Sequence, residues 1–254
     1  MELSLKGRVA VVTGGGKGIG SGISRALAAA GAKVLFNYNS NPDMAIKTLE
    51  LIKEAGGEAY TMLADVSDRN QVDAMIQKAV ELYGGVDILV NNAAWQPNMD
   101  IDEYTEKDYD QIMAINLGGY FRCTQAALPY LKKNGYGRVI NISSVHGKRP
   151  SDFDVCYSMC KGGIKMLTRE AAVEFKKYGI TVNAILPGGI KIEFKSGVTH
   201  TFKRNHVERE RKYDYLFKGG LPEDIANIVV FIASDEGSHL SGTSVRADAG
   251  AMLV

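Results

Sequence analysis

Arg8–Ala30, RVAVVTGGGKGIGSGISRALAAA, joins three kinds of local sequence that together decide the fold. Val9–Thr13 is short, apolar and rich in valine, which is typical of a strand buried on both faces. Gly14–Gly20 is a glycine-rich turn. Apolar residues then recur at intervals of three and four, which predicts a helix; they are Ile19, Ile23, Ala26, Leu27 and Ala30.

A strand, a glycine turn and a helix in this order can hold a pyrophosphate. Glycine lets the backbone approach the anion closely, and the free N–H groups at the start of the helix stabilise it. An ordinary tight turn between strand and helix is the simpler alternative, because a glycine-rich turn alone is weak evidence. The flanking strand and helix favour a dinucleotide site, with Gly14, Lys17, Gly18, Ile19 and Gly20 as its candidates.

Composition excludes several classes of function. The chain has 254 residues, 45% of them hydrophobic and 23% charged, and a net charge of +1, so nothing favours a nucleic-acid or membrane partner. Three cysteines are too few for a disulfide framework, and no Cys or His pair elsewhere completes a metal site with them, so we expect no metal. No signal peptide or membrane span is visible, and we expect a soluble, cytoplasmic protein.

Strand and helix patterns alternate along the whole chain. Strands are predicted at Val9–Thr13, Lys33–Tyr38, Glu58–Leu63, Val86–Val90, Arg138–Ile142, Ile180–Leu186 and Thr243–Ala247. Helices after the first are predicted from Pro42, from Asp68, and over Tyr104–Asn116, Leu117–Lys133, Val155–Lys177 and Pro222–Ser234. No linker interrupts the pattern. It therefore predicts a single α/β domain over residues 1–254, a doubly wound parallel sheet of the Rossmann type with helices on both faces.

Polar residues follow the ends of several predicted strands. In sheets of this kind ligands bind beyond the carboxyl ends of the strands. The glycine turn, Asp65, Asn91, Ser143-Ser144 and Pro187-Gly188 should therefore converge on one crevice.

Tyr157 and Lys161 are four positions apart on a predicted helix, so their side chains lie on one face. An ammonium near a phenol stabilises the phenolate and makes the tyrosine a general acid or base. Ser144, at the end of a strand, could bond a substrate oxygen. The pattern Tyr-x-x-x-Lys alone is common on helix surfaces.

Taken together, the motifs resemble those of the short-chain dehydrogenase/reductase family over essentially the whole chain. The matching residues are Thr13-Gly14-x-x-x-Gly18-x-Gly20, Asp65-Val66, Asn91-Asn92-Ala93, Asn116, Ser144 thirteen residues before Tyr157, Lys161, and Asn183 with Pro187-Gly188. The resemblance implies a hydride-transferring oxidoreductase that interconverts a secondary alcohol and a ketone with a nicotinamide cofactor.

The resemblance also implies roles for individual residues. Tyr157 would exchange a proton with the substrate oxygen, which Ser144 would orient, while Lys161 lowers the Tyr157 pKa and holds the nicotinamide ribose. Asn116 would anchor a water that links Lys161 to solvent. For the cofactor, Asp65 and Val66 would contact adenine, Asn91 and Ala93 the adenosine ribose and nearby backbone, and Pro187, Gly188 and Ile190 the nicotinamide. Some of these residues also have an ordinary structural alternative. Asn116 could form a hydrogen bond within its helix, Asp65 could cap a nearby helix, and Pro187-Gly188 could form a turn.

Three positions depart from the family pattern. Ala94 and Ala249 stand where the family usually has glycine, and Ile192 where a threonine often holds the carboxamide. The nicotinamide position near Ile192 is therefore in doubt, and Ala94 could crowd its turn.

The end of the second strand bears on the cofactor. NAD enzymes of this kind usually place Asp or Glu there to bind the ribose 2′-hydroxyl. Here Asn37-Tyr38-Asn39-Ser40 has no carboxylate, and Lys17 could reach a 2′-phosphate. We expect NADP to be preferred, with NAD possible; the alternative is that Lys17 is only a solvated turn residue.

The substrate is less well determined. Residues 191–218 are a predicted lid with eight basic and four acidic residues, a net +4, which indicates either an anionic substrate or, as we favour, a solvated face. Trp95, His146, Phe153 and Asp154 could line the pocket.

Within the family, the contexts of Ser144 and Tyr157 look similar to sugar dehydrogenases such as glucose dehydrogenase. The 3-oxoacyl carrier-protein reductases and hydroxysteroid dehydrogenases remain alternatives, the former less favoured because Gly135 and Tyr178 stand where they tend to carry arginines. A non-catalytic nucleotide sensor would be expected to lack Tyr157 or Lys161. The family commonly forms homotetramers, and the apolar tail Ala251–Val254 fits that assembly.

Overall fold

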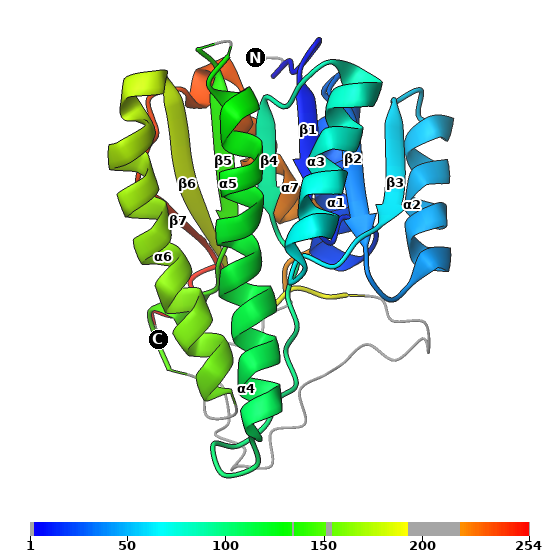
Figure 1. The fold of residues 1–254 in the computed structure, drawn as a ribbon. Helices are drawn as coiled ribbons and strands as arrows, with labels where there is room; N and C mark the ends of the chain where they lie inside the picture. Colours follow the sequence, from blue (N-terminus) through cyan, green and yellow to red (C-terminus); the bar gives the residue numbers. More distant parts are fainter. Residues whose placement is uncertain (1–2, 134, 151–153, 193–218, 254) are drawn as a thin grey trace.

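The computed structural model describes residues 3–133, 135–150, 154–192 and 219–253 (Figure 1). Seven parallel strands form one sheet in the order β3-β2-β1-β4-β5-β6-β7. Their bounds are β1 Val9–Val12, β2 Lys33–Tyr38, β3 Ala59–Leu63, β4 Ile88–Asn91, β5 Gly137–Ile142, β6 Ile180–Pro187 and β7 Ser244–Ala247. The chain order reverses between β1 and β4, which is where such sheets bind ligands.

Helices cover both faces of the sheet (Figure 1). One face packs against α1 (Gly18–Ala29), α2 (Pro42–Glu54) and α7 (Pro222–Ala233), and the other against α3 (Arg69–Tyr83), α5 (Gly119–Leu131) and α6 (Val155–Phe175). α4 (Glu106–Met113) precedes α5. Among the helices that the structure describes, none is both long and apolar enough to cross a lipid bilayer. The predicted single-domain, doubly wound sheet is confirmed.

The two faces of β1 explain why its sequence is a continuous apolar run. Ala10 and Val12 belong to the core beneath α1 and α7, whereas Val11 belongs to the core beneath α3 and α5. Successive side chains of a strand point to opposite faces, so a central parallel strand needs an apolar residue at every position. All four residues of β1 are buried.

Several element boundaries differ from the prediction by one or two residues, and two of the differences are informative. β4 begins at Ile88, not Val86, and the Asp87 carboxylate before it accepts a hydrogen bond from the Val9 amide at 2.9 Å. The two predicted helices that met between Asn116 and Leu117 are joined by a π-helical turn, Ala114–Gly118. A π-turn holds one residue more than an α-turn, and hydrophobic periodicity does not reveal such an insertion.

Ala249 occupies a backbone conformation that suits glycine. Its φ is +48°, in the left-handed region where a Cβ is strained, and the family pattern has glycine there. We expect Ala249→Gly to raise the free energy of unfolding by up to ~1 kcal/mol, because relief of strain outweighs the greater freedom of glycine in the unfolded chain. Denaturant unfolding measures the effect, and a lower stability would contradict the strain argument.

Candidate active site

The glycine turn connects the carboxyl end of β1 to the start of α1. Gly14 and Gly18 have φ of +63° and +53°, which glycine adopts without strain. At Gly20 the reason is space: a Cβ would lie 2.2 Å from the Gly14 carbonyl oxygen and 2.6 Å from Asn92 Nδ2. The turn therefore folds back on the first residues of α1, leaving no room for a side chain.

Asparagine side chains hold this turn in place. Asn37, inside β2, accepts a hydrogen bond from the Gly14 amide at 3.0 Å and donates one to the Ala64 carbonyl at 2.6 Å. Asn92 donates to the carbonyls of Thr13 and Gly14 at 2.9 and 3.1 Å. The sequence motifs predicted this role for neither side chain, although an asparagine within the apolar strand KVLFNY indicates a buried polar contact.

The glycine turn has features that suit the binding of an anion. α1 starts after Lys17, whose side chain makes no cap hydrogen bond, so the cap residue does not satisfy the first N–H groups of the helix. Helix N-terminal N–H groups of this kind bind phosphate. Beside them lies a small hollow lined by Gly14, Gly16, Lys17, Tyr38, Asn39, Ser40 and Asn41. The residues present therefore fit a dinucleotide.

Lys17 is the cation of this hollow. In the favoured orientation of the Asn41 amide, its oxygen accepts a hydrogen bond from Lys17 Nζ at 3.3 Å. Lys17 and Ile19 flank Gly18, and Ile19 packs against the core beneath α1 and α7. Lys17 therefore lies beside the end of β2, as its predicted role requires.

Asp65 and Val66 follow β3. Asp65 accepts hydrogen bonds from the Ser67 amide and hydroxyl at 2.8 and 2.7 Å, and from Asn39 Nδ2 at 3.2 Å. Val66 is buried, with its side chain against Gly119. Asp65 therefore makes the contacts of a turn-forming side chain next to α3, which is the structural alternative to its predicted role.

Asn91 ends β4 and Ala93 follows it, and the two residues differ in exposure. The Asn91 side chain is buried and donates to Thr124 Oγ1 and Asn141 Oδ1 at 3.1 and 2.9 Å. It therefore faces the core, and only its backbone can approach a ligand. The Ala93 amide donates to Thr13 Oγ1 at 3.0 Å, which joins this loop to the glycine turn.

The segment after β6 lies against the same turn. Pro187 ends β6, the Gly188 amide donates to the Ala247 carbonyl at 2.9 Å, and Ile190 forms a bridge with Gly220. Ile192 faces the glycine turn, because a Cβ on Gly18 would lie 3.1 Å from its Cγ2.

Of the two other departures from the family pattern, Ala249 is strained as described above. Ala94 is exposed and lacks the positive φ that would require glycine, so the expected crowding is not seen.

Asn116 lies in the π-helical turn and is fully buried. Its side chain forms a reciprocal pair of hydrogen bonds with the Trp95 main chain: the Trp95 amide donates to Oδ1 and Nδ2 donates to the Trp95 carbonyl, both at 2.8 Å. π-turns inside helices occur often at functional sites. Here the turn fixes the loop after β4 next to the start of α5.

Ser144 and Tyr157 meet at the carboxyl end of β5. Ser144 follows that strand, and its hydroxyl accepts a hydrogen bond from the His146 amide at 3.1 Å. Tyr157 lies in the first turn of α6. Burial raises the pKa of Tyr157 to about 12; a hydrogen bond with Ser144 acts to lower it, and the Asp154 carboxylate acts to raise it. The free protein thus holds Tyr157 as a neutral phenol near pH 7.

Lys161 lies one turn further along α6 and is almost fully buried. Its Nζ donates to the Ile142 carbonyl at 2.7 Å and lies 5.3 Å from the centroid of the Tyr157 ring. Burial lowers the pKa of Lys161 to about 7. The four predicted catalytic residues therefore come from the end of β5, from α6 and from the π-turn that packs against α6. They are Asn116, Ser144, Tyr157 and Lys161.

Two side chains near Tyr157 were not singled out from the sequence. Tyr104 donates a hydrogen bond of 2.6 Å to Asp154 Oδ1, and Tyr120 bonds the Lys161 ammonium. Asp154 also caps α6 by accepting from the Tyr157 amide at 3.1 Å. Trp95, one of the predicted pocket residues, packs with Tyr104 and Tyr157 around a small buried cluster that includes Cys156 and Cys160.

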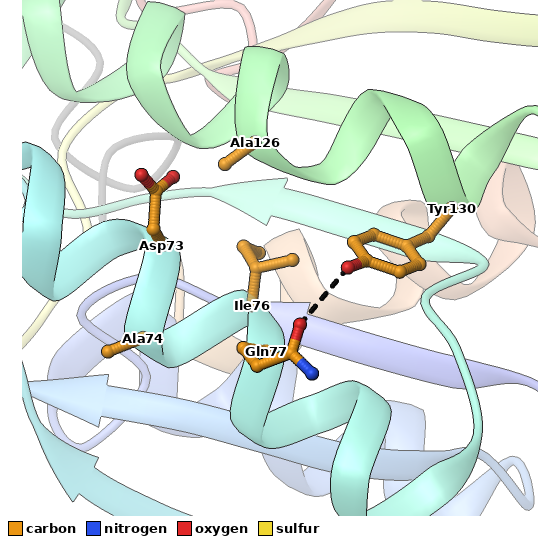
Figure 2. A pocket seen from close by; sticks show the side chains of 6 residues that line it. All are labelled: Asp73, Ala74, Ile76, Gln77, Ala126 and Tyr130. Atoms are coloured by element: carbon orange, nitrogen blue, oxygen red, sulfur yellow. Dashed lines mark hydrogen bonds between the residues drawn. The ribbon is translucent and has the colours of Figure 1, made fainter.

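Part of the prediction lies outside the described residues. This applies to Phe153 and to residues 193–218 of the predicted lid. A separate hollow of about 420 Å³ lies between α3 and α5, lined by Asp73, Ala74, Ile76, Gln77, Ala126 and Tyr130 (Figure 2). It contains none of the predicted site residues. The Tyr130 hydroxyl donates to Gln77 Oε1 across it at 3.1 Å.

Comparison with known proteins gives the family. Residues 8–202 match the family model described as short chain dehydrogenase. The chain belongs to the short-chain dehydrogenase/reductase family. It is 36% identical to glucose 1-dehydrogenase 2 of Bacillus subtilis (100% of this chain, 98% of that protein) and 37% identical to 3β-hydroxysteroid dehydrogenase 1 of Eggerthella lenta (98% and 95%).

The fold agrees with this assignment. A solved structure of a dehydrogenase/reductase from Sinorhizobium meliloti superimposes with a TM-score of 0.89 at 33% identity, over 98% of this chain and 96% of the other. The protein is thus an oxidoreductase of a family that uses NAD(P), and the predicted resemblance is confirmed.

Proposed function

We propose that this short-chain dehydrogenase interconverts a secondary alcohol and a ketone with NADP as its preferred cofactor, and that the substrate is of the sugar or polyol type. One observation carries the proposal. The buried Lys161 ammonium and the hydroxyls of Tyr157 and Ser144 gather at the carboxyl end of β5, in the same sheet edge as the glycine turn.

In the proposed mechanism Tyr157 is the proton-transfer group. Its phenol is neutral at pH 7, so it can donate a proton to the oxygen of a ketone as that carbon is reduced. Ser144, which bonds Tyr157, orients the substrate oxygen. Lys161 stabilises the phenolate that remains, because an ammonium favours a nearby negative charge. Asn116 maintains the loop at Trp95. As the family resemblance implies, it would also anchor a water that links Lys161 to solvent.

The cofactor site follows from the glycine turn. Gly14, Gly18, Ile19 and Gly20 would take the pyrophosphate, and Lys161 and Tyr157 the nicotinamide ribose. Asp65, Val66 and the Asn91–Ala93 backbone would border the adenosine, and Pro187, Gly188 and Ile190 the nicotinamide. When bound, the nicotinamide supplies or accepts the hydride. The tight contact between Gly20 and the Gly14 carbonyl oxygen supports this assignment, because it holds the turn in the form that presents the N–H groups at the start of α1 to an anion.

Lys17 supports the preference for NADP. It lies beside the end of β2, where Asn39 and Ser40 replace the acidic residue that would repel a 2′-phosphate. We expect Lys17→Ala to weaken NADPH binding about tenfold, because one charge-assisted contact is lost, and to change NADH binding little. Titration of the nicotinamide fluorescence gives both constants. Tighter binding of NADH than of NADPH by the unmodified protein would refute the preference.

The sugar or polyol assignment is supported by a relative named for glucose. A hydroxysteroid is the second candidate. Trp95, Tyr104, Met113 and Val155 form an apolar group next to Tyr157, and another relative is named for a 3β-hydroxysteroid. A 3-oxoacyl carrier-protein reductase is less favoured, since Gly135 and Tyr178 offer no arginine to an acidic carrier.

We further propose a cytoplasmic homotetramer. Large apolar side chains are exposed on the outer faces of α5 and α6, among them Phe121, Met159, Met166 and Val173. Exposed apolar patches on long helices are typical of subunit interfaces.

The test is a turnover assay with aldoses, polyols, hydroxysteroids and 3-hydroxyacyl thioesters, each with NADP and with NAD, followed by nicotinamide absorbance. Oxidation of an aldose or polyol with NADP would support the proposal. Oxidation of hydroxysteroids alone would favour the second candidate. Cofactor binding without turnover of any alcohol, in either direction, would favour a nucleotide sensor, and absence of binding would refute the assignment of the glycine turn.

A further inference from the structure

Lys161 is held by a contact outside the predicted site. Its Nζ donates to the Tyr120 hydroxyl oxygen at 3.3 Å and to the Ile142 carbonyl at 2.7 Å. The Tyr120 hydroxyl in turn donates to the same carbonyl at 2.8 Å. An ammonium can only donate, and a phenol has one proton and free lone pairs, so the directions of these bonds are fixed. Three polar atoms from α6, α5 and β5 thus form a closed cluster.

We propose that Tyr120 is a positioning residue whose hydroxyl oxygen holds the Lys161 ammonium, in its charged form, at the carboxyl end of β5. The proposal rests on the proposed function, in which Lys161 supports Tyr157. It extends that function to a residue on α5, directly after the π-helical turn that contains Asn116.

Burial makes this contact important. Both Tyr120 and Lys161 are buried to within 2% of full burial, so bulk water cannot replace a lost acceptor. The cost of desolvating the ammonium lowers the pKa of Lys161 to about 7, and every acceptor that bonds the ammonium opposes that effect. The other ionisable groups recorded against it in the described residues are Tyr157 and Cys160, both from α6. They are neutral at pH 7, since burial raises the pKa of each.

Geometry also favours a positional role. Lys161 Nζ lies 5.3 Å from the ring centroids of both Tyr120 and Tyr157, within the range of cation–π attraction. The ammonium therefore lies close to both phenol rings. Tyr120 is not a proton relay, because its own proton is bonded to a main-chain carbonyl that passes it no further. Its oxygen can only hold the ammonium.

The first test uses no substrate. The Cε resonance of Lys161, in protein labelled with ¹³C-lysine and assigned by its absence in Lys161→Arg, should titrate near pH 7. In Tyr120→Phe the midpoint should fall by about one pH unit, a tenfold loss of proton affinity. An unchanged midpoint would overturn the proposal. This readout does not depend on the enzyme's activity, so it separates failure of the proposal from failure of the proposed function.

The second readout is ketone reduction with NADPH as a function of pH. Tyr157 stays protonated over pH 5–8, so the loss of activity on the alkaline side reports Lys161. Tyr120→Phe should move that limb about one unit toward acid and lower the rate near pH 7 up to about tenfold, with little change at pH 5. If the Lys161 titration midpoint falls but the pH profile of ketone reduction does not move, the Tyr120 contact is supported and the role of Lys161 in the proposed function is refuted. A loss of rate that is equal at all pH values would overturn the positioning role.

Tyr136→Phe is the matched control. Tyr136 is also buried, and its hydroxyl donates to the Ala233 carbonyl, far from Lys161 in the fold. The control should lose stability as Tyr120→Phe does, yet leave the Lys161 titration and the pH profile unchanged. A shift of the Lys161 midpoint in this control would mean that the effect is one of general destabilisation, which would overturn the proposal.

A 3-fluorotyrosine at position 120 serves if Tyr120→Phe does not fold. Fluorine makes the phenol a better donor to Ile142 and a weaker acceptor from Lys161. A purely structural tyrosine would then leave the Lys161 midpoint where it is, and this result would overturn the proposal. A positioning tyrosine should lower the midpoint while the melting temperature is unchanged.

Discussion

Tyr157→Phe is expected to abolish turnover while leaving the cofactor bound. The variant keeps the ring, so packing beside Trp95 and Tyr104 should persist, but it has no proton to give to the substrate oxygen. Loss of a general acid or base costs about 10²–10⁴ in rate, and we expect a loss near 10³ in both directions. Steady-state kinetics with the best alcohol and ketone of the substrate panel, at pH 7 and 9, measure it.

The control for this variant is Tyr130→Phe. It removes a phenol hydroxyl too, but from the hollow between α3 and α5, where Tyr130 bonds Gln77 (Figure 2). Its turnover should equal that of the unmodified protein. NADPH affinity should be unchanged in Tyr130→Phe and should fall by no more than about tenfold in Tyr157→Phe, which loses one hydrogen bond to the nicotinamide ribose. If Tyr157→Phe retained more than about a tenth of the turnover, another group would have to transfer the proton.

The pH dependence of ketone reduction and that of alcohol oxidation should differ, because the two reactions need different protonation states of Tyr157. Burial raises the pKa of Tyr157 to about 12, so the free protein contains the acid form that ketone reduction needs at neutral pH. Alcohol oxidation needs the phenolate, whose population grows as the pH rises toward that pKa. We therefore expect the rate of oxidation to rise relative to that of reduction between pH 7 and 10.

The sequence was sufficient to predict the order of elements and the sheet edge at which the candidate site residues lie. Parallel strands must place their carboxyl ends at one edge, so Ser144 and the glycine turn were bound to share it. The spacing of Tyr157 and Lys161 on one helix likewise fixed their common face. These conclusions depend on local periodicity and topology, which a single sequence contains.

Contacts between distant segments were not predictable in this way. The π-turn at Asn116, the Asn37 bond to Gly14 and the Tyr120 bond to Lys161 each join residues whose proximity depends on how α5, β2 and β5 pack. Apolar periodicity shows which face of a helix is buried, but not which polar group a buried hydroxyl will meet. Asn91 illustrates the same limit, because its motif indicated a ligand contact whereas its side chain bonds Thr124 and Asn141 in the core.

The second large effect is expected for Gly20→Ala. The added methyl carbon would lie 2.2 Å from the Gly14 carbonyl oxygen, a distance that no relaxation of a side chain can relieve because the contact is with backbone. Either the turn or the start of α1 must move, and overpacking of this kind costs about 1–3 kcal/mol of stability. Misplacement of a group by about 1 Å can cost an enzyme about 10² in rate. We expect a similar effect on binding, with NADPH affinity falling about a hundredfold.

Gly85→Ala is the matched control for this prediction. Gly85 lies between α3 and β4, has no positive φ, and a Cβ there would meet no atom within 4 Å. The same chemical change should therefore leave both NADPH affinity and melting temperature as they are. Calorimetric titration with NADPH, after thermal unfolding has shown that each variant is folded, measures the difference. If Gly20→Ala bound NADPH as tightly as Gly85→Ala, the pyrophosphate could not depend on the close approach of Gly14 and Gly20, and the anion would have to bind elsewhere on the sheet edge.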